Sequence, residues 1–172
     1  MHAPFSLKTD RGFTLIEMVV VLALVALLLA VTLPRLSVSP FKDSKRDATL
    51  WITNRIQQLK EQSLRRARNY SLHIDIDTGH FWSTHEKMQP DEIDLARQGG
   101  YNLPEGVLIE SVEFPNSDRQ TAGEAEIQFF KKGYSQMAQI QARFADRSRR
   151  TFSIEPFLMR AKIYDGPVSI NR

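Results

Sequence analysis

Cysteine is absent from this chain of 172 residues. Disulfide bonds, thiolate metal sites and thiol catalysis are therefore excluded, and any domain exported from the cytoplasm must fold without a covalent cross-link. The sequence also lacks internal repeats and low-complexity tracts. Its formal net charge of +3 is too mild to imply nucleic-acid binding by itself.

The sequence motifs of common enzyme classes are missing as well. There is no His-Glu-x-x-His, no Gly-x-Ser-x-Gly and no phosphate-binding glycine loop. Besides His2, the histidines are His73, His80 and His85, and they fall in or beside a predicted hairpin, where such side chains are more often solvated than catalytic. We therefore expect a protein that is not an enzyme and needs no cofactor.

The most informative feature that is present is an apolar run from Phe13 to Leu33, 21 residues long. At 1.5 Å per residue, about 20 helical residues match a hydrocarbon core of roughly 30 Å, so the run predicts a membrane-spanning helix. Lys8 and Arg11 precede it and favour a cytoplasmic N-terminus. The following segment also carries basic residues, so this charge contrast is weak.

One carboxylate, Glu17, interrupts the start of this run. A charge at the centre of a bilayer costs about 2.5–3.5 kcal/mol on insertion scales, so an intramembrane carboxylate indicates a functional role. A cleaved secretory signal is one alternative, because Ser37-Val38-Ser39 has the small-x-small pattern of a cleavage site. A plain membrane anchor is another, but it leaves Glu17 without a role.

The residues around Glu17 suggest a specific family. Gly12 is followed by Phe13-Thr14-Leu15-Ile16-Glu17, which resembles the class III signal of type IV pilins and type II secretion pseudopilins. The resemblance implies that a prepilin peptidase cuts between Gly12 and Phe13, and that Phe13 is then N-methylated. It also implies that Glu17 meets the N-terminal amine of a neighbouring subunit during assembly. Pro34 matches a position where members of this family often carry proline.

A second helix is predicted from Ser39-Pro40, as N-cap and first helical residue, to about Asn69. Pro34 and Pro40 predict a kink or a short unwound stretch between the two helices. A stripe with helical spacing should pack on a sheet; its members are Ile52, Ile56, Leu59, Ser63 and Ala67. The opposite face should be solvated, and it contains Lys60, Glu61, Arg65 and Arg68.

The rest of the chain has mainly strand patterns. Alternation on either side of Thr78-Gly79 predicts a hairpin, and a short helix is predicted from Asp91 to Arg97. Further strands are predicted over residues 107–114, 125–130, 138–144, 151–155 and 157–164. The predicted fold class is α+β, with a long N-terminal helix packed on an antiparallel sheet of about six strands.

This C-terminal part is similar to the GspH (FimT-like) subfamily of pseudopilins. The similarity rests on Leu103-Pro104-Glu105-Gly106-Val107 and on Phe130-Lys131-Lys132-Gly133-Tyr134-Ser135. Pro156-Phe157 departs from the subfamily, where a glycine turn is commoner, so the final hairpin is less securely predicted.

One group of acidic residues resembles a calcium-binding loop. It consists of Asp75-Ile76-Asp77-Thr78-Gly79 together with Glu86. The glycine stands at the fifth position of this segment, whereas a helix-loop-helix calcium site needs it at the sixth. We interpret these residues as a solvated turn. The C-terminal segment offers only Asp165 and Asn171, so we expect no metal site there either.

Basic residues gather at one predicted turn, which contains Arg143, Arg147, Arg149 and Arg150. Such a cluster can neutralise phosphates and give salt-dependent DNA binding, and Lys131 and Lys132 are potential neighbours. The alternative is a solvated turn that keeps a sheet edge soluble. The question matters because some GspH-like minor pilins bind DNA during uptake.

Together these observations predict four segments: a cleaved leader (1–12), a transmembrane and assembly helix (13–34), an amphipathic helix (35–69) and a β-rich domain (70–172). The resemblance implies a minor pseudopilin of a type II secretion system, anchored in the bacterial inner membrane with its C-terminal domain in the periplasm. Its partners would be the prepilin peptidase, other pseudopilins, the inner-membrane assembly platform and the lipid bilayer. A DNA-binding minor pilin of a type IV pilus (FimT/FimU-like) is the alternative, with nucleic acid as partner, and a component of another envelope machine is a third option.

Overall fold

The computed structural model describes residues 14–32 and 40–170, and the side chains of residues 14–28 and 44–170. The chain divides into two compact units, residues 1–39 and residues 40–172. The predicted kink between Pro34 and Pro40 involves residues 33–39, which lie outside the described residues.

The first unit contains helix α1 (Leu15–Thr32), which begins close to the predicted start of the apolar run. Every side chain described in it, from Leu15 to Leu28, is exposed. Among the described residues, no helix is both long and apolar enough to cross a membrane.

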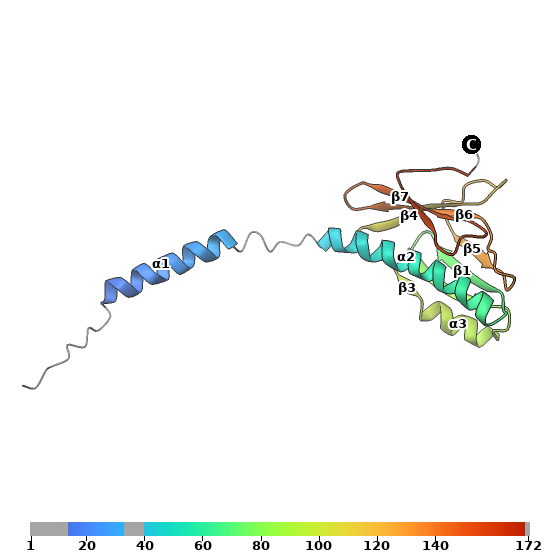
Figure 1. Ribbon diagram of the computed structural model, residues 1–172, viewed down its shortest axis with the longest axis horizontal. Helices are drawn as coiled ribbons and strands as arrows, with labels where there is room; N and C mark the ends of the chain where they lie inside the picture. The colour runs from blue at the N-terminus through green and yellow to red at the C-terminus, as the bar shows by residue number, and fades with distance from the viewer. Residues whose placement is uncertain (1–13, 33–39, 171–172) are drawn as a thin grey trace, which may run out of the picture. The chain divides into compact units, whose positions relative to one another are not determined.

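The second unit begins with helix α2 (Pro40–Arg65), which lies along the strands in Figure 1. Four members of the predicted stripe, Ile52, Ile56, Leu59 and Ser63, are at most 1% exposed. The helix ends earlier than predicted, because the chain turns through a left-handed residue, Ala67, with φ of 47°. The Arg68 N–H donates to the Ser63 carbonyl and the Ala67 N–H to the Leu64 carbonyl, which is the Schellman pattern.

Two predictions for α2 are therefore wrong. Ala67 is exposed rather than part of the buried stripe, because it lies beyond the end of the helix. Lys60 is only 5% exposed, although it was predicted to face water. Its ammonium donates to the carbonyls of Glu155 at 2.6 Å and Leu158 at 2.5 Å, which lie far along the chain and cover it.

The strands form two four-stranded antiparallel sheets rather than the single sheet of about six strands that the sequence predicted. The first sheet has the order β3-β2-β1-β5, and its strands are β1 (Tyr70–Asp75), β2 (His80–His85), β3 (Tyr101–Asn102) and β5 (Glu124–Phe129). The second has the order β4-β6-β7-β8, and its strands are β4 (Val107–Glu113), β6 (Ala138–Phe144), β7 (Arg149–Ile154) and β8 (Lys162–Asp165). The α+β class is confirmed.

The hairpin predicted around Thr78-Gly79 is confirmed as β1 and β2, with Gly79 at a positive φ of 68°. The predicted short helix is α3 (Pro90–Gln98), whose first turn is capped by the Glu92 carboxylate accepting the Gln89 N–H at 2.8 Å. The last predicted strand, 157–164, is shortened to β8, because turns and bends follow Pro156.

One apolar core joins α2 to both sheets. Strands of the first sheet contribute Leu72, Ile74, Ile127 and Phe129, and those of the second contribute Val112, Ile140, Phe152 and Ile154. Burying a side chain of this size stabilises the folded state by about 1.5–3 kcal/mol. The unit of residues 40–172 therefore contains a core of its own, which supports folding without the first unit.

Candidate functional site

The first candidate site is the N-terminal end of α1. Gly12, Phe13 and Pro34 lie outside the described residues, so the cleavage and methylation positions and the helix kink remain predictions. Glu17 is described, and it lies in the first turn of the helix. Its backbone N–H donates to the Thr14 carbonyl at 3.0 Å and faces the Thr14 hydroxyl oxygen at 3.3 Å.

Thr14 therefore caps α1, and the spacing Thr-x-x-Glu is that of a capping box. An acidic side chain in the first turn also interacts favourably with the positive end of the helix dipole. These local interactions give Glu17 one role in starting the helix. Its carboxylate is exposed and can therefore also form an ion pair with a cationic group of another molecule.

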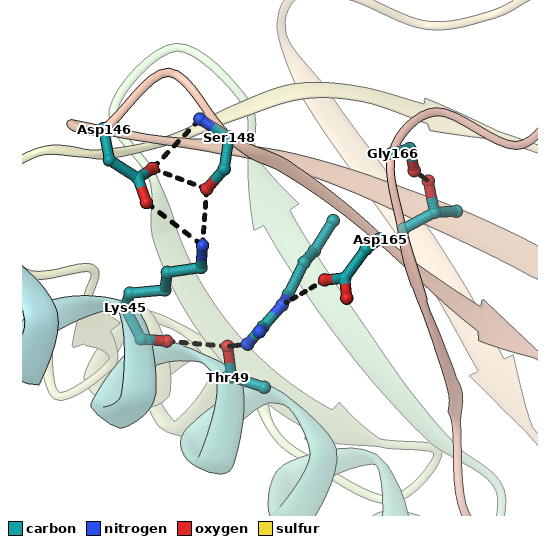
Figure 2. A network of polar contacts seen from close by, with 8 residues as sticks. Lys45, Thr49, Asp146, Ser148, Asp165 and Gly166 are labelled. Atoms are coloured by element: carbon teal, nitrogen blue, oxygen red, sulfur yellow. Dashed lines mark hydrogen bonds and ion pairs between the residues drawn. The ribbon is translucent and has the colours of Figure 1, made fainter.

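The second candidate site is the predicted arginine cluster, which lies at the β6–β7 turn and on the strands beside it. Figure 2 shows how this turn is joined to α2. The Lys45 ammonium donates to the Asp146 carboxylate at 3.2 Å and to the Ser148 hydroxyl at 2.6 Å. Hydrogen bonds from the Ser148 hydroxyl and N–H, together with Lys45, lower the pKa of Asp146 to about 2. The polar groups of the turn are therefore paired with one another and with α2.

Three of the four arginines in the cluster are engaged by carboxylates. Glu110 accepts both Arg143 at 3.1 Å and Arg149 at 2.8 Å. Arg150 donates to Asp165 at 3.0 Å and to the Thr49 hydroxyl at 3.0 Å. Within the described part of the chain, Arg147 has no ion pair, and it sits in the turn with φ of 62°.

These pairings were not foreseen from the sequence. Glu110 comes from β4, which pairs with β6, and Asp165 ends β8, which pairs with β7. Strand pairing places these carboxylates beside arginines that are 15 to 39 residues away in the sequence. No local sequence pattern predicts contacts between residues so far apart. Lys131, another candidate, faces Glu86 at 3.8 Å.

The acidic turn and the histidines have structural partners. The Asp75 carboxylate accepts the N–H groups of Asp77 and Thr78, which closes the hairpin turn. His73 contacts Glu124 and Thr84, each at 2.8 Å. In the described ranges, no group of three or more acidic or histidine side chains is arranged to hold a metal ion.

Residues 7–33 match a family model described as the prokaryotic N-terminal methylation motif. This match confirms that the N-terminal segment carries the methylation motif that the sequence predicted. No curated protein sequence matches the chain.

Two solved structures are similar to the chain, and both are described as the minor pseudopilin EpsH of the type II secretion system of Vibrio cholerae. One is 12% identical, with a TM-score of 0.48, and the match covers 70% of this chain and 94% of the other. The second is 15% identical, with a TM-score of 0.47, covering 69% and 97%.

Proposed function

We propose that this chain is a prepilin-like structural subunit, and specifically a minor pseudopilin of a type II secretion system. The observation that carries the prepilin-like role is the N-terminal methylation motif over residues 7–33; the choice of a secretion pseudopilin rests on the GspH-like segments 103–107 and 130–135. The motif leads into α1, whose described side chains are exposed and almost all apolar, with Glu17 in the first turn. Such a surface suits lipid before assembly and neighbouring helices after it.

In the proposed sequence of events, the leader (1–12) is removed between Gly12 and Phe13, and Phe13 is N-methylated. Residues 13–34 anchor the chain in the inner membrane, and the domain from Pro40 onward stands in the periplasm. The partners are the prepilin peptidase, sister pseudopilins and the assembly platform in the membrane. The role is assembly rather than catalysis.

The role proposed for Glu17 follows from the cost of isolated charge. A carboxylate in lipid and an ammonium in lipid are each unfavourable alone, and pairing between two subunits relieves both. Phe13 and Glu17 are four residues apart, or about 6 Å along a helix. An offset of this size gives two neighbouring helices a defined register when one carboxylate meets the other's N-terminal amine.

The DNA-binding alternative has less support from the described surface. Arg143, Arg149 and Arg150 already face carboxylates, so phosphates would have to compete with Glu110 and Asp165. We therefore place the secretion role first and treat DNA binding as an outcome to be tested.

The test is processing and assembly in cells that make the other subunits. Glu17→Ala should lose its leader normally but enter filaments poorly, because the carboxylate is not needed for cleavage. Glu105→Ala, a change at an exposed loop residue of the second unit, is the matched control. Normal assembly of Glu17→Ala would contradict the proposal.

The cleavage position is tested separately with Gly12→Val, which should remain at full length. A mature-sized product from this variant would refute the assigned cut. The choice of machine is tested by deleting the gene: loss of secretion of folded proteins with DNA uptake retained is the expected result, and the reverse result would favour the type IV pilus.

A further inference from the structure

A cavity of about 480 Å³ lies beside α2, between that helix and the α3–β3 segment. This volume is within the range of roughly 300–1,000 Å³ that is usual for binding sites. Its walls include four aromatic residues and one cation, and among the lining residues are Trp51, Arg55, Phe81, Trp82, Leu95 and Tyr101. None of the sites discussed above uses this cavity.

The aromatic rings of Trp51, Phe81 and Tyr101 hold one another through ring contacts. Trp51 stacks on Tyr101 with ring centroids 4.0 Å apart and planes 11° apart, and it meets the edge of Phe81 at 5.4 Å. Burial and the nearby Asp47 raise the pKa of Tyr101, so its phenol stays protonated at neutral pH. The chain has only two tryptophans, and both line this cavity. Tryptophan is among the residues that most often dominate binding energy at interfaces.

Arg55 supplies the charge, and the fold does not neutralise it. Its Nε donates to the Ser83 hydroxyl at 3.1 Å and its Nη1 reaches the Gln58 amide oxygen at 3.5 Å. Both acceptors are neutral, and within the described residues no carboxylate forms an ion pair with Arg55. Burial lowers the pKa of this guanidinium, which reflects incomplete solvation of the cation. Of the five N–H donors of an arginine, three remain for a ligand.

The position of the cavity favours a polypeptide ligand. Gly100 and Tyr101 line it, and Tyr101 belongs to β3, the two-residue edge strand of the first sheet. The main chain on the outer side of β3 pairs with no other strand among the described residues. An extended peptide can use such an edge, whereas a free carboxylic acid cannot. A side chain at Gly100 would come within 2.5 Å of the Phe81 carbonyl, so the glycine keeps β3 close to β2.

We propose that this cavity binds an extended segment of a partner subunit, in which a carboxylate side chain pairs with Arg55 and an adjacent apolar side chain packs on Trp51 and Leu95. The assignment of the partner as a sister subunit rests on the function proposed above. The binding chemistry does not, because it depends only on the second unit. The cavity is thus a specificity site for an acidic and apolar motif, separate from the assembly contact of Glu17.

The experiment is a fluorescence titration of the full chain in a neutral detergent, since the two tryptophans make the emission a direct report on the cavity. The probe is acetyl-Leu-Glu-Leu-amide, and acetyl-Leu-Gln-Leu-amide is the uncharged match. We expect saturable binding of the acidic peptide and about tenfold weaker binding of the glutamine peptide, because only the former pairs with the guanidinium.

The variants test Arg55 directly. Arg55→Met should weaken binding of the acidic peptide by about tenfold and abolish the preference over the glutamine peptide. Arg65→Met, which changes an exposed arginine on the same helix, should change neither value. Arg55→Gln removes the charge but keeps a polar side chain and should also abolish the preference, so it replaces Arg55→Met if far-UV circular dichroism shows that Arg55→Met does not fold.

Three results would overturn the proposal: equal binding of the two peptides, an unchanged preference in a folded Arg55→Met variant, or no binding at millimolar peptide. Hexanoate tests whether the cavity binds a free carboxylic acid rather than a peptide segment. If hexanoate binds as tightly as the acidic peptide, the assignment to a partner segment is wrong. Failure of the proposed function would appear instead in the Glu17→Ala assembly assay, which does not involve this cavity.

Discussion

The buried ammonium of Lys60 should make the second unit more stable as the pH rises into the moderately alkaline range. Burial lowers the pKa of Lys60 from 10.5 to about 8, against the opposing effect of the nearby Glu155 carboxylate. Between these two values the unfolded chain binds more protons than the folded chain. The free energy of unfolding therefore rises with pH in that window, because deprotonation relieves the cost of the buried charge.

The magnitude follows from the two pKa values. Between about pH 7.5 and about pH 9.5, the contribution of Lys60 to the free energy of unfolding should increase by about 2 kcal/mol. Most of this gain comes above pH 8, where the folded-state amine loses its proton. The neutral amine can still donate to the carbonyls of Glu155 and Leu158, so the contact between α2 and the segment after β7 is kept.

The assay is urea unfolding of residues 40–172 at about pH 7.5, 8.5 and 9.5, followed by far-UV circular dichroism. Lys60→Met is the matched variant, because it keeps an unbranched chain without the titrating group. Other groups that titrate in this range contribute equally to both proteins, so the difference between the two profiles isolates Lys60. Parallel profiles for wild type and Lys60→Met across the window would refute the reasoning.

Two further predictions concern the end of α2 and the arginine cluster. Ala67→Gly should stabilise the second unit by about 0.5–1 kcal/mol in urea unfolding, because glycine adopts the positive φ of this C-cap position without steric cost; an equal or lower stability would contradict the assigned cap. In fluorescence anisotropy with labelled duplex DNA, residues 40–172 should bind only weakly at physiological salt, because three arginines of the cluster are paired with carboxylates. Micromolar binding that falls steeply with salt, and disappears when Arg147, Arg149 and Arg150 are changed to alanine, would instead support the DNA-uptake alternative.

The sequence predicted those parts of the fold that depend on neighbouring residues. The β1–β2 hairpin follows from alternation on both sides of one turn, and the buried stripe of α2 follows from helical spacing. Alternation shows which face of a strand is buried, but it does not show which strand lies beside it. The pairing of β5 with β1, and the resulting division into two sheets, depends on contacts over about fifty positions and was therefore missed.

The same distinction explains the results for the candidate sites. The methylation motif is contiguous, so the sequence was sufficient to predict it, and the match over residues 7–33 confirms it. The arginine cluster is also contiguous, but its electrostatic character depends on Glu110 and Asp165, which strand pairing brings to it. Lys60 was assigned to solvent because the segment that covers it, around Glu155 and Leu158, is about a hundred residues away in the chain.

Comparison with Lys45 and Lys60 shows how Arg55 differs from two other cations of α2 that the fold holds by internal contacts. Lys45 is neutralised by Asp146, and Lys60 is held by two carbonyls and can lose its proton at moderately alkaline pH. Arg55 has only neutral oxygen contacts, and a guanidinium does not deprotonate in proteins. These neutral contacts offset only part of the cost of its partial burial, and a carboxylate supplied from outside the unit would offset more. That asymmetry along one helix is the physical reason to look for the partner at the Trp51 cavity rather than at the arginine turn.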